Sequence, residues 1–395
     1  MDKSSHRNEV PVLVLGTGLT SLGVVRSFGR AGIPVYCVSE NLGFVAHSRW
    51  FRRPPGKIKT VGGTEELVPF LEQLPFDKVV LMPCADNWVS AVASVPNNLR
   101  QKCLVSQPSR AVLDLLVDKG RFATALKEND IPHPATELLD SEERFSSIAE
   151  SMFSGSFLKP HNSQVFHQHY GVKACRVSSR EDAIAQYRHK TQDGLEVLFQ
   201  EYVPGPASNH YFIDGFVDKT GSVRAIFARR RLRMYPVDFG NSTYMRSIEL
   251  DEVADAVEGL KRFLAAIAYR GIFSAEFKFD HRDNLFKILE INARPWWFVE
   301  YAARCGVDVC QLAYRDAQNL PIPYINGYRV GVKSVHPYFD VNICMELCRK
   351  GEMSLLSWFR SWAFAQYPVL CYDDPLPCFN WWRRKLAERA KKAVS

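Results

Sequence analysis

The sequence predicts an α/β domain followed by a larger α+β region, and two stretches carry that prediction. Residues 10–38 read as a buried strand, a turn containing Gly16 and Gly18, a helix and a second strand, which is the order found in nucleotide-binding α/β domains. Residues 271–280 and 286–292 alternate polar and apolar side chains on either side of a turn at 281–284, as the strands of a hairpin do. We therefore expect a parallel sheet first and a hairpin-containing sheet later.

The composition is that of a globular protein with several domains. A chain of 395 residues, 46% hydrophobic and 24% charged, is long enough for two or three domains. The net charge of +7 suits small anionic ligands and does not by itself predict nucleic acid binding. The polar start, the lack of any apolar run of about 18 residues and ten cysteines without a CxxC pair favour a cytoplasmic protein with reduced thiols.

The N-terminal glycines leave two readings open. Gly16, Gly18 and Gly23 do not follow the GxGxxG spacing, and Glu40 is the one acid near the end of the second strand. Either the turn is structural, which we favour, or it belongs to a dinucleotide site of an oxidoreductase. A third strand at 78–83 ends in Cys84-Ala85-Asp86. Alternating strands and helices to about residue 108 fit one small parallel-sheet domain.

Basic residues recur in the middle of the chain. Lys119 lies at an expected helix start, where the helix dipole already supplies positive charge. An anionic ligand would compensate for it, and so would solvent. Lys159 ends an apolar strand, and Arg229, Arg231 and Arg233 share one face of another. A nucleic-acid surface would extend beyond one strand, so an anion site inside a cleft is the simpler interpretation.

The stretch 286–297 supplies candidate metal ligands. Read as a strand, it points Glu290 and Asn292 to one face and Leu289 and Ile291 to the other. Pairing with 271–280 would bring Glu276 beside them, and oxygen ligands of this kind bind divalent cations. Arg294, just beyond, has the planar fork that binds phosphate or carboxylate. The alternative is a half-exposed hairpin with ordinary charges on its wet face.

In this order, the motifs resemble those of the ATP-grasp superfamily and, more narrowly, its carboxylate–amine ligases, which include D-aspartate ligase-type enzymes. The resemblance covers roughly residues 10 to 325 and rests on Lys119, Lys159, Gln200-Glu201-Tyr202-Val203, Glu276 and Glu290-Ile291-Asn292. It implies a Rossmann-like domain over 1–108 and an ATP-grasp domain over 109–325. Within the latter, a lid over about 135–203 and a body over about 204–325 would hold ATP between them.

The resemblance also implies a role for each motif. Lys119 and Lys159 would face the ATP phosphates, and Gln200 to Val203 would form the hinge at adenine, with Glu201 accepting from the amino group. Asn209 or His210 falls near the usual ribose contact. Mg²⁺, or Mn²⁺ in its place, would be held by Glu276, Glu290 and Asn292. Arg294 would stabilise the transferred phosphate, and Arg231 with the loop 240–243 would receive the carboxylate substrate.

The implied activity is ATP-dependent joining of a small carboxylic acid, expected to be an amino acid, to an amine. Activation as an acyl phosphate asks mainly for positioning and charge neutralisation. One departure supports an alternative, an ATP-binding regulator without turnover. The loop after Lys159, usually glycine-rich, here carries one glycine at its far end and offers His161, Ser163, His167 and His169 instead.

Residues 326–395 form an aromatic and basic extension that the resemblance does not explain. Trp358, Phe359, Trp362 and Phe364 precede a break at 373–377, and a basic helix follows. Such a segment suits a membrane surface, in which case the protein would sit at the inner membrane face, or a partner protein. Packing on the body is the alternative. Self-association also stays open.

Overall fold

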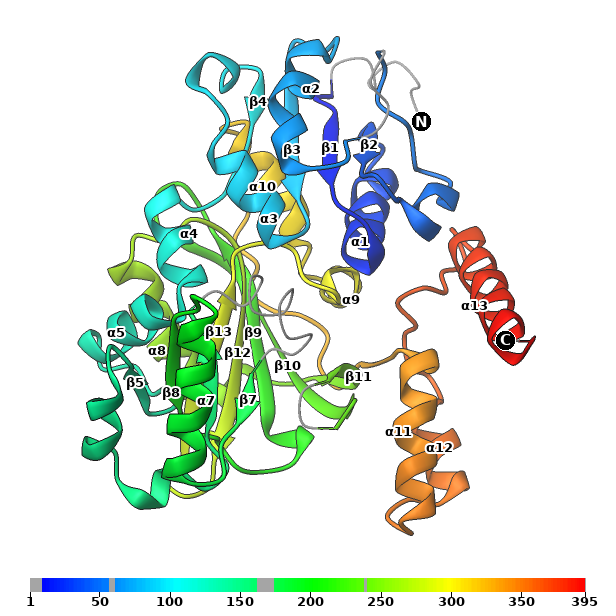
Figure 1. Cartoon of the computed structure of the whole chain (residues 1–395). Coiled ribbons are helices and arrows are strands. Elements are labelled where there is room, and N and C mark those ends of the chain that lie inside the picture. Colours follow the sequence, from blue (N-terminus) through cyan, green and yellow to red (C-terminus); the bar gives the residue numbers. More distant parts are fainter. Residues whose placement is uncertain (1–8, 57–60, 162–173, 238–239, 395) are drawn as a thin grey trace.

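Three sheets organise the chain (Figure 1). The structure is a computed structural model, and it describes residues 9–56, 61–161, 174–237 and 240–394. The first sheet is parallel and the other two are antiparallel. The fold class predicted from the sequence, α/β followed by α+β, is confirmed.

The N-terminal sheet has the strand order β2-β1-β3-β4. All four residues of β1 are buried, because helices cover both faces of a parallel sheet and leave no solvent side. The sheet and its helices consist of β1 (Val12–Leu15), α1 (Gly18–Arg30), β2 (Val35–Val38), α2 (Leu67–Gln73), β3 (Val79–Pro83), α3 (Asp86–Ala93) and β4 (Cys103–Leu104). Each predicted strand is present, one to two residues shorter than the sequence suggested.

Two capped helices connect this domain to a small sheet. The side chain of Ser109 accepts from the Val112 N–H at the start of α4, and that of Asp118 accepts from the Arg121 N–H at the start of α5. The small sheet has the order β5-β8-β6-β7. Its elements are α4 (Arg110–Val117), α5 (Lys119–Glu128), β5 (Thr136–Leu138), β6 (Phe157–Pro160), β7 (Cys175–Arg176), α7 (Arg180–Gln192) and β8 (Val197–Gln200). Its core is built from aromatic rings, among them Phe145, Phe153 and Phe199.

The large sheet has the order β13-β12-β9-β10-β11-β14. One face packs against α8, α4 and α5 through Phe273, Ala275 and Phe277 of β12. The other face packs its apolar half against α9, α10 and the N-terminal domain, and its polar half faces the small sheet. The elements are β9 (His210–Val217), β10 (Val223–Tyr235), β11 (Asn241–Ser247), α8 (Ala254–Ala266), β12 (Gly271–Asp280), β13 (Leu285–Asn292), α9 (Val299–Cys305), α10 (Val309–Ala317) and β14 (Lys333–Val335).

The hairpin of β12 and β13 confirms one expectation and corrects another. Glu276 pairs with Glu290 and Ser274 with Asn292 in the antiparallel register. The register shifts between Glu276 and Phe277, where a β-bulge leaves Leu289 without a cross-strand partner. Ile288 and Ile291, three residues apart, therefore both enter the core. The prediction that Leu289 and Ile291 share the apolar face was wrong for this reason.

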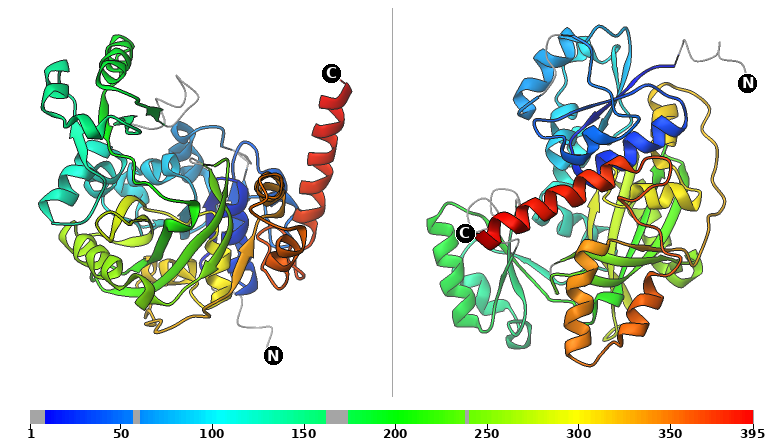
Figure 2. Two further views of the ribbon diagram at one scale, coloured as in Figure 1. Left: turned by 90° about the horizontal axis from the view of Figure 1, so that it is seen from below. Right: turned by 90° about the vertical axis from the view of Figure 1, so that its right-hand side faces the viewer.

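The C-terminal segment packs on the body rather than forming a separate layer. β14 is the edge strand of the large sheet, although the sequence analysis placed residues 333–335 in the extension. Three helices follow, α11 (Pro337–Arg349), α12 (Leu355–Trp362) and α13 (Leu376–Val394), and they line one edge of the molecule (Figure 2). Within the described ranges no helix has the length and apolarity needed to span a membrane. All ten cysteines are free thiols.

Candidate active site

A cavity of about 280 Å³ lies between the small sheet and the polar half of the large sheet. Strands from both sheets and helix α5 build its walls. Lys119, Lys159, Gln200, Arg231, Glu276 and Glu290 all line it. Side chains separated by up to about 170 positions in the sequence therefore meet in one space, and both signs of charge are present.

The predicted metal ligands lie at the end of the hairpin. Glu276 and Glu290 face each other across β12 and β13, and the Asn292 side-chain nitrogen donates to Glu290 Oε1 at 3.0 Å. In the described part of the chain no group of three or more His, Cys, Asp or Glu side chains is arranged to hold a metal. Two carboxylates and an amide fit a Mg²⁺ ion that also takes oxygens from a nucleotide, because Mg²⁺ keeps few protein ligands beside phosphate and water.

Glu276 is charged and tightly held. Its Oε1 lies 2.7 Å from His210 Nδ1 and 3.2 Å from Arg231 Nη2. Burial opposes the charged form of Glu276, but Arg231 and the His210 hydrogen bond outweigh burial and lower the pKa of this carboxyl. The wet hairpin face considered as an alternative is not observed, since Ser274, Lys278 and Asp280 on the same face are buried.

Two lysines face the carboxylates. Lys119 Nζ lies 3.7 Å from Glu290 Oε2, and Lys159 Nζ donates to Gln200 Oε1 at 2.5 Å. Burial of the Lys159 ammonium, together with repulsion from Lys119, lowers its pKa to about 8. An anion bound between Lys119 and Lys159 would relieve this repulsion. The lysines therefore suit a polyphosphate that would pass between them and the carboxylates.

The predicted hinge begins at the end of β8, and all four of its residues line the cavity. The Glu201 carboxylate accepts from the Ala135 N–H at 3.1 Å and pairs with Arg282 and Lys287. These basic partners already occupy the carboxylate assigned to the adenine amino group. The Tyr202 ring packs edge-on against Phe157. Apolar side chains nearby, including Phe157 and Ile288, supply the surface that a flat ring requires.

Arg294 lies at the junction with the N-terminal domain. Its guanidinium pairs in bidentate fashion with Asp86, Nε to Oδ1 at 2.7 Å and Nη2 to Oδ2 at 3.0 Å, and Nη2 also donates to Asn292 Oδ1 at 3.1 Å. Burial alone would lower the pKa of Arg294, but Asp86 raises it. In the sequence, Asp86 stands out only as the residue that closes the third predicted strand. Its position after β3 is the signal that could have marked it, because ligand sites lie at the carboxyl ends of parallel strands.

Of the remaining predicted residues, some line the cavity and others do not. Arg231 lines the cavity but is already paired with Glu276 and donates to Ser242 at 2.8 Å. The prediction of a loop at 240–243 was wrong, since β11 begins at Asn241 and Thr243 donates to Asp340. Asn209 is buried and donates to the Phe279 carbonyl at 3.3 Å, outside the cavity lining.

Two residues next to these positions, His210 and Lys278, also lie close to the site. Of the two candidates for the ribose contact, Asn209 and His210, only His210 is among the residues that line the cavity. Lys278, buried on the Glu276 face and 4.6 Å from the centre of the Tyr202 ring, was not singled out by the sequence. Apart from His161, the glycine-poor loop after Lys159, with Ser163, His167 and His169, lies outside the described residues.

The two-sheet cavity, with in-register carboxylates and two opposed lysines, defines the class of protein. The chain has the ATP-grasp fold of its structural neighbours. More particularly, it resembles carboxylate–amine ligases. It is 24% identical over 334 residues to "D-aspartate ligase" of Enterococcus faecium, with 80% of this chain and 78% of that protein covered. No family model matches the sequence.

Solved structures share the fold. The biotin carboxylase domain of the Hydrogenobacter thermophilus 2-oxoglutarate carboxylase, solved with MgADP and bicarbonate, superposes with a TM-score of 0.62 at 16% identity, covering 83% of this chain and 74% of that chain. An L-amino acid ligase from Bacillus licheniformis gives a TM-score of 0.56 at 15% identity, covering 79% and 75%. At these identities the likeness establishes the architecture.

Proposed function

We propose that this protein is an ATP- and Mg²⁺-dependent ligase that joins a small carboxylic acid to an amine. One observation carries the proposal: Glu276 and Glu290 stand in register on the hairpin and line the same cavity as Lys119 and Lys159. Its relatives named above are ligases or carboxylases. They favour turnover over the regulatory alternative.

The reaction proceeds in two displacements. A carboxylate oxygen of the substrate attacks the γ-phosphorus of ATP, ADP leaves, and an acyl phosphate forms. The amine nitrogen then attacks the acyl carbon, the C–N bond forms, and inorganic phosphate departs with the amine losing a proton. Lys119 and Lys159 neutralise phosphate charge in this scheme, and Glu276, Glu290 and Asn292 would hold the ion. When bound, Mg²⁺ supplies charge neutralisation at the phosphates.

We assign the acid to the amino acid class. A zwitterionic substrate needs a cation and an anion side by side. Arg294 and Asp86 lie next to Asn292 and pair with each other, so such a substrate would exchange this pair for its own carboxylate and ammonium. The acid in the name of the E. faecium relative, D-aspartate, belongs to this class. Arg294 and Arg231 remain our candidates for contact with the reacting groups.

Glu290→Gln tests the metal assignment. The substitution removes one charge from the cation site and leaves a side chain of the same shape, so ADP release in the presence of substrate pairs should fall by at least about 100-fold, as expected when a group stabilising the transition state is lost. A screen of carboxylate and amine pairs for phosphate release provides the assay. Circular dichroism should be unchanged.

Glu258→Gln, on the exposed face of α8, is the matched control and should turn over normally. Normal turnover by Glu290→Gln would reject the assignment. A wild-type chain that binds ATP without forming product across the screen would reject the ligase proposal itself.

We also propose that the C-terminal extension makes a peripheral contact with the inner membrane surface. Support comes from the aromatic side chains that α12 and the segment around it expose, with Phe359 65% and Phe364 fully exposed. Co-sedimentation of the full chain with lipid vesicles tests this contact, and protein that stays in the supernatant would reject it.

A further inference from the structure

The C-terminal segment is fixed to the rest of the molecule by two buried arginines. Arg26 of α1 has no exposed side-chain surface and pairs with Glu300 and Asp374, each at 2.9 Å. Arg233 of β10 pairs with Asp340 of α11, at 2.6 Å and 2.9 Å. A buried pair of this kind is costly to break, because breaking it leaves a charge buried without its partner. What the segment exposes is therefore presented in a fixed orientation.

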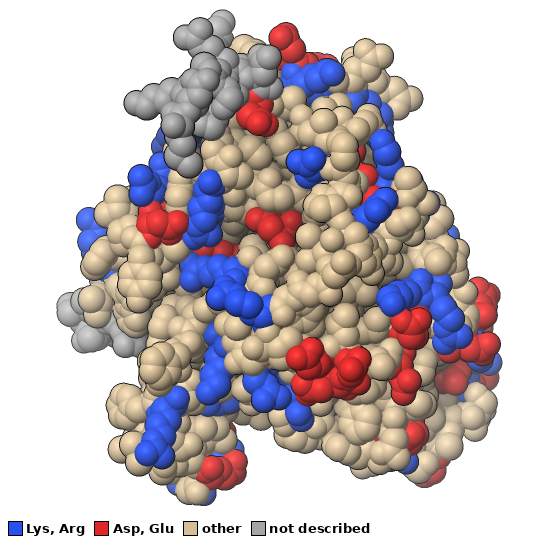
Figure 3. Space-filling model, turned by 180° about the vertical axis from the view of Figure 1, so that it is seen from behind, with Lys and Arg blue, Asp and Glu red and all other residues tan. Residues whose placement is uncertain are grey.

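The segment exposes apolar side chains to an extent the rest of the chain does not. Among the described residues, every phenylalanine and tryptophan classed as exposed lies within it, namely Phe359, Phe364, Phe379 and Trp382. On α13, Phe379, Trp382 and Leu386 are spaced i, i+3 and i+7 and form one stripe. We call these three side chains the α13 stripe. Seen from behind, the lobe of α11 and α12 shows few charged side chains (Figure 3, lower left).

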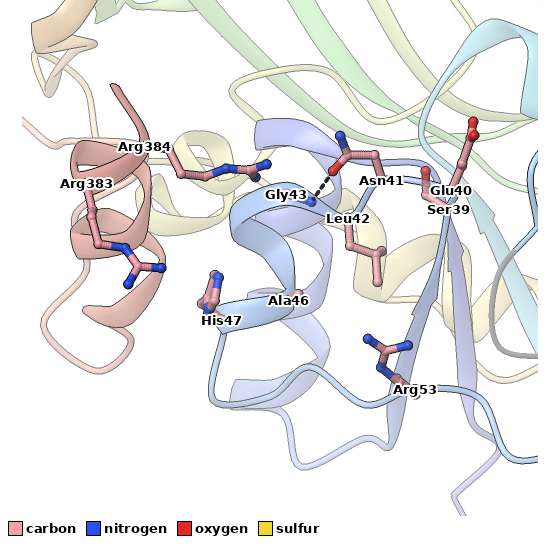
Figure 4. A pocket seen from close by; sticks show the side chains of 10 residues that line it. All are labelled: Ser39, Glu40, Asn41, Leu42, Gly43, Ala46, His47, Arg53, Arg383 and Arg384. Atoms are coloured by element: carbon pink, nitrogen blue, oxygen red, sulfur yellow. Dashed lines mark hydrogen bonds between the residues drawn. The ribbon is translucent and has the colours of Figure 1, made fainter. Parts of the chain in front are cut away.

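A second cavity, of about 400 Å³, lies where α13 meets the 3₁₀ turn η2 (Gly43–His47). Arg53, Arg383, Arg384 and His47 line it, and Glu40 is the single acid in its wall. Figure 4 shows Arg383 beside His47 and Arg384 extended toward Gly43. A Cβ built on Gly43 would lie 3.6 Å from Arg384 Nη1. That distance is an ordinary van der Waals contact, so the guanidinium lies against the turn.

The charges around this cavity are not balanced. In the part of the chain that the structure describes, no carboxylate lies within ion-pair distance of Arg53, Arg383 or Arg384. By contrast, Arg26, Arg30, Arg233 and Arg294 all have acidic partners. Figure 4 shows Arg383 and Arg384 on one side of the η2 turn and Arg53 on the other. Their charges favour an anion at this wall, and phosphate matches the planar fork of a guanidinium.

We propose that this cavity binds the phosphate of an anionic phospholipid while the α13 stripe enters the interface beside it. The inference rests on the peripheral membrane contact proposed above and names its site and ligand chemistry. The stripe directly adjoins Arg383 and Arg384 along the helix, and aromatic side chains beside basic ones are what an interfacial helix requires. The cavity does not include the glycine turn at Gly16 and Gly18, so it does not match a dinucleotide site.

Vesicle sedimentation with the full chain tests the proposal. Vesicles of phosphatidylglycerol and phosphatidylcholine should bind the wild type, and vesicles of phosphatidylcholine alone should bind it weakly. The double substitution R383E/R384E should weaken binding by at least about tenfold, since each basic residue near an anionic surface contributes roughly a factor of five. F379S/L386S should weaken binding to the same vesicles without changing the charge.

K261E/R262E is the matched control, because it reverses two adjacent charges on α8, at the opposite side of the molecule from α13 (Figure 1). It should bind like the wild type. Equal binding by R383E/R384E and the wild type would overturn the headgroup site. So would saturable binding of sn-glycerol 3-phosphate without vesicle binding, which would identify a soluble ligand. A dimer lost in F379S/L386S, with no vesicle binding, would identify a second copy as the occupant.

ATP-dependent phosphate release without vesicles separates this inference from the ligase proposal. All three variants should keep wild-type turnover, because none of the substituted residues lines the cavity between the two sheets. Vesicle binding by a chain that lacks turnover would support the lipid site and reject the ligase. Turnover without vesicle binding would reject the lipid site alone.

Discussion

At the scale of single residues, the charge state of Lys159 decides how the candidate site meets a nucleotide. Lys159 shares the cavity with Lys119, and burial with this second positive charge lowers its pKa to about 8. The ammonium is charged below that value and neutral above it. Only the charged form attracts phosphate, so nucleotide affinity should decrease as the pH rises through about 8.

We expect the KM for ATP to rise between about pH 7 and about pH 9, by up to tenfold for each unit above the pKa. Steady-state kinetics at constant ionic strength measure this KM at each pH. Lys159→Arg keeps a cation at every pH in this range, so its KM should be higher overall but nearly independent of pH. An unchanged pH profile in Lys159→Arg would assign the titration to another group.

At the scale of elements, close packing of β9 against β10 and β12 places the predicted ligands. Gly215 is the point of closest approach, since a Cβ there would lie 2.3 Å from the Ala225 carbonyl oxygen and 2.5 Å from the Phe273 ring. No side chain fits without moving backbone. The glycine therefore lets the Phe273 ring cover the strand, and the three strands keep the register that aligns Glu276 with Glu290.

Gly215→Ala should lower the free energy of unfolding by about 1–3 kcal/mol, the usual cost of overpacking a core. Gly259→Ala in α8 is the matched control. A Cβ there meets nothing within 4 Å, and replacing a helix-interior glycine should raise stability by about 0.5–1 kcal/mol. Urea unfolding measures both. Equal effects of the two substitutions would contradict the packing argument.

At the scale of the whole molecule, Arg26 joins three parts of the chain. It extends from α1 of the N-terminal domain to Glu300 of α9, and to the carboxylate of Asp374 and three backbone carbonyl groups of the C-terminal segment. Ser48 donates to the same Asp374 carboxylate. The desolvation of these charges is offset only while all the partners are present. The N-terminal domain and the C-terminal segment should therefore unfold together.

Arg26→Ala should lower the free energy of unfolding by about 3 kcal/mol or more, because it leaves the Asp374 carboxylate buried without its cation. Urea unfolding gives the size of the effect, and limited proteolysis should show cleavage near residues 368–374. Arg188→Ala breaks a pair with Glu142 whose arginine is 61% exposed, so it should cost less than about 1 kcal/mol. Similar losses in both variants would show that Arg26 does not act as a buried junction.

Local patterns in the sequence were enough to predict the central geometry of the site. Alternation in residues 271–292 placed Glu276 beside Glu290, because the side chains of a strand repeat every two residues and a short turn sets the register. Apolar runs into glycine turns predicted the parallel sheet, and the order of the motifs pointed to the superfamily. Signals of this kind depend only on near neighbours in the chain.

Contacts between charges that are distant in the sequence became visible only in the folded protein. The bulge at Leu289 arises from pairing between whole strands, and the partner of Arg294, Asp86, lies 208 positions away. β14 pairs with β11 of the large sheet, and Asp374 pairs with Arg26. Both contacts likewise join remote segments. No local periodicity encodes such contacts, because packing and the desolvation of each charge select the partner only when the chain is folded.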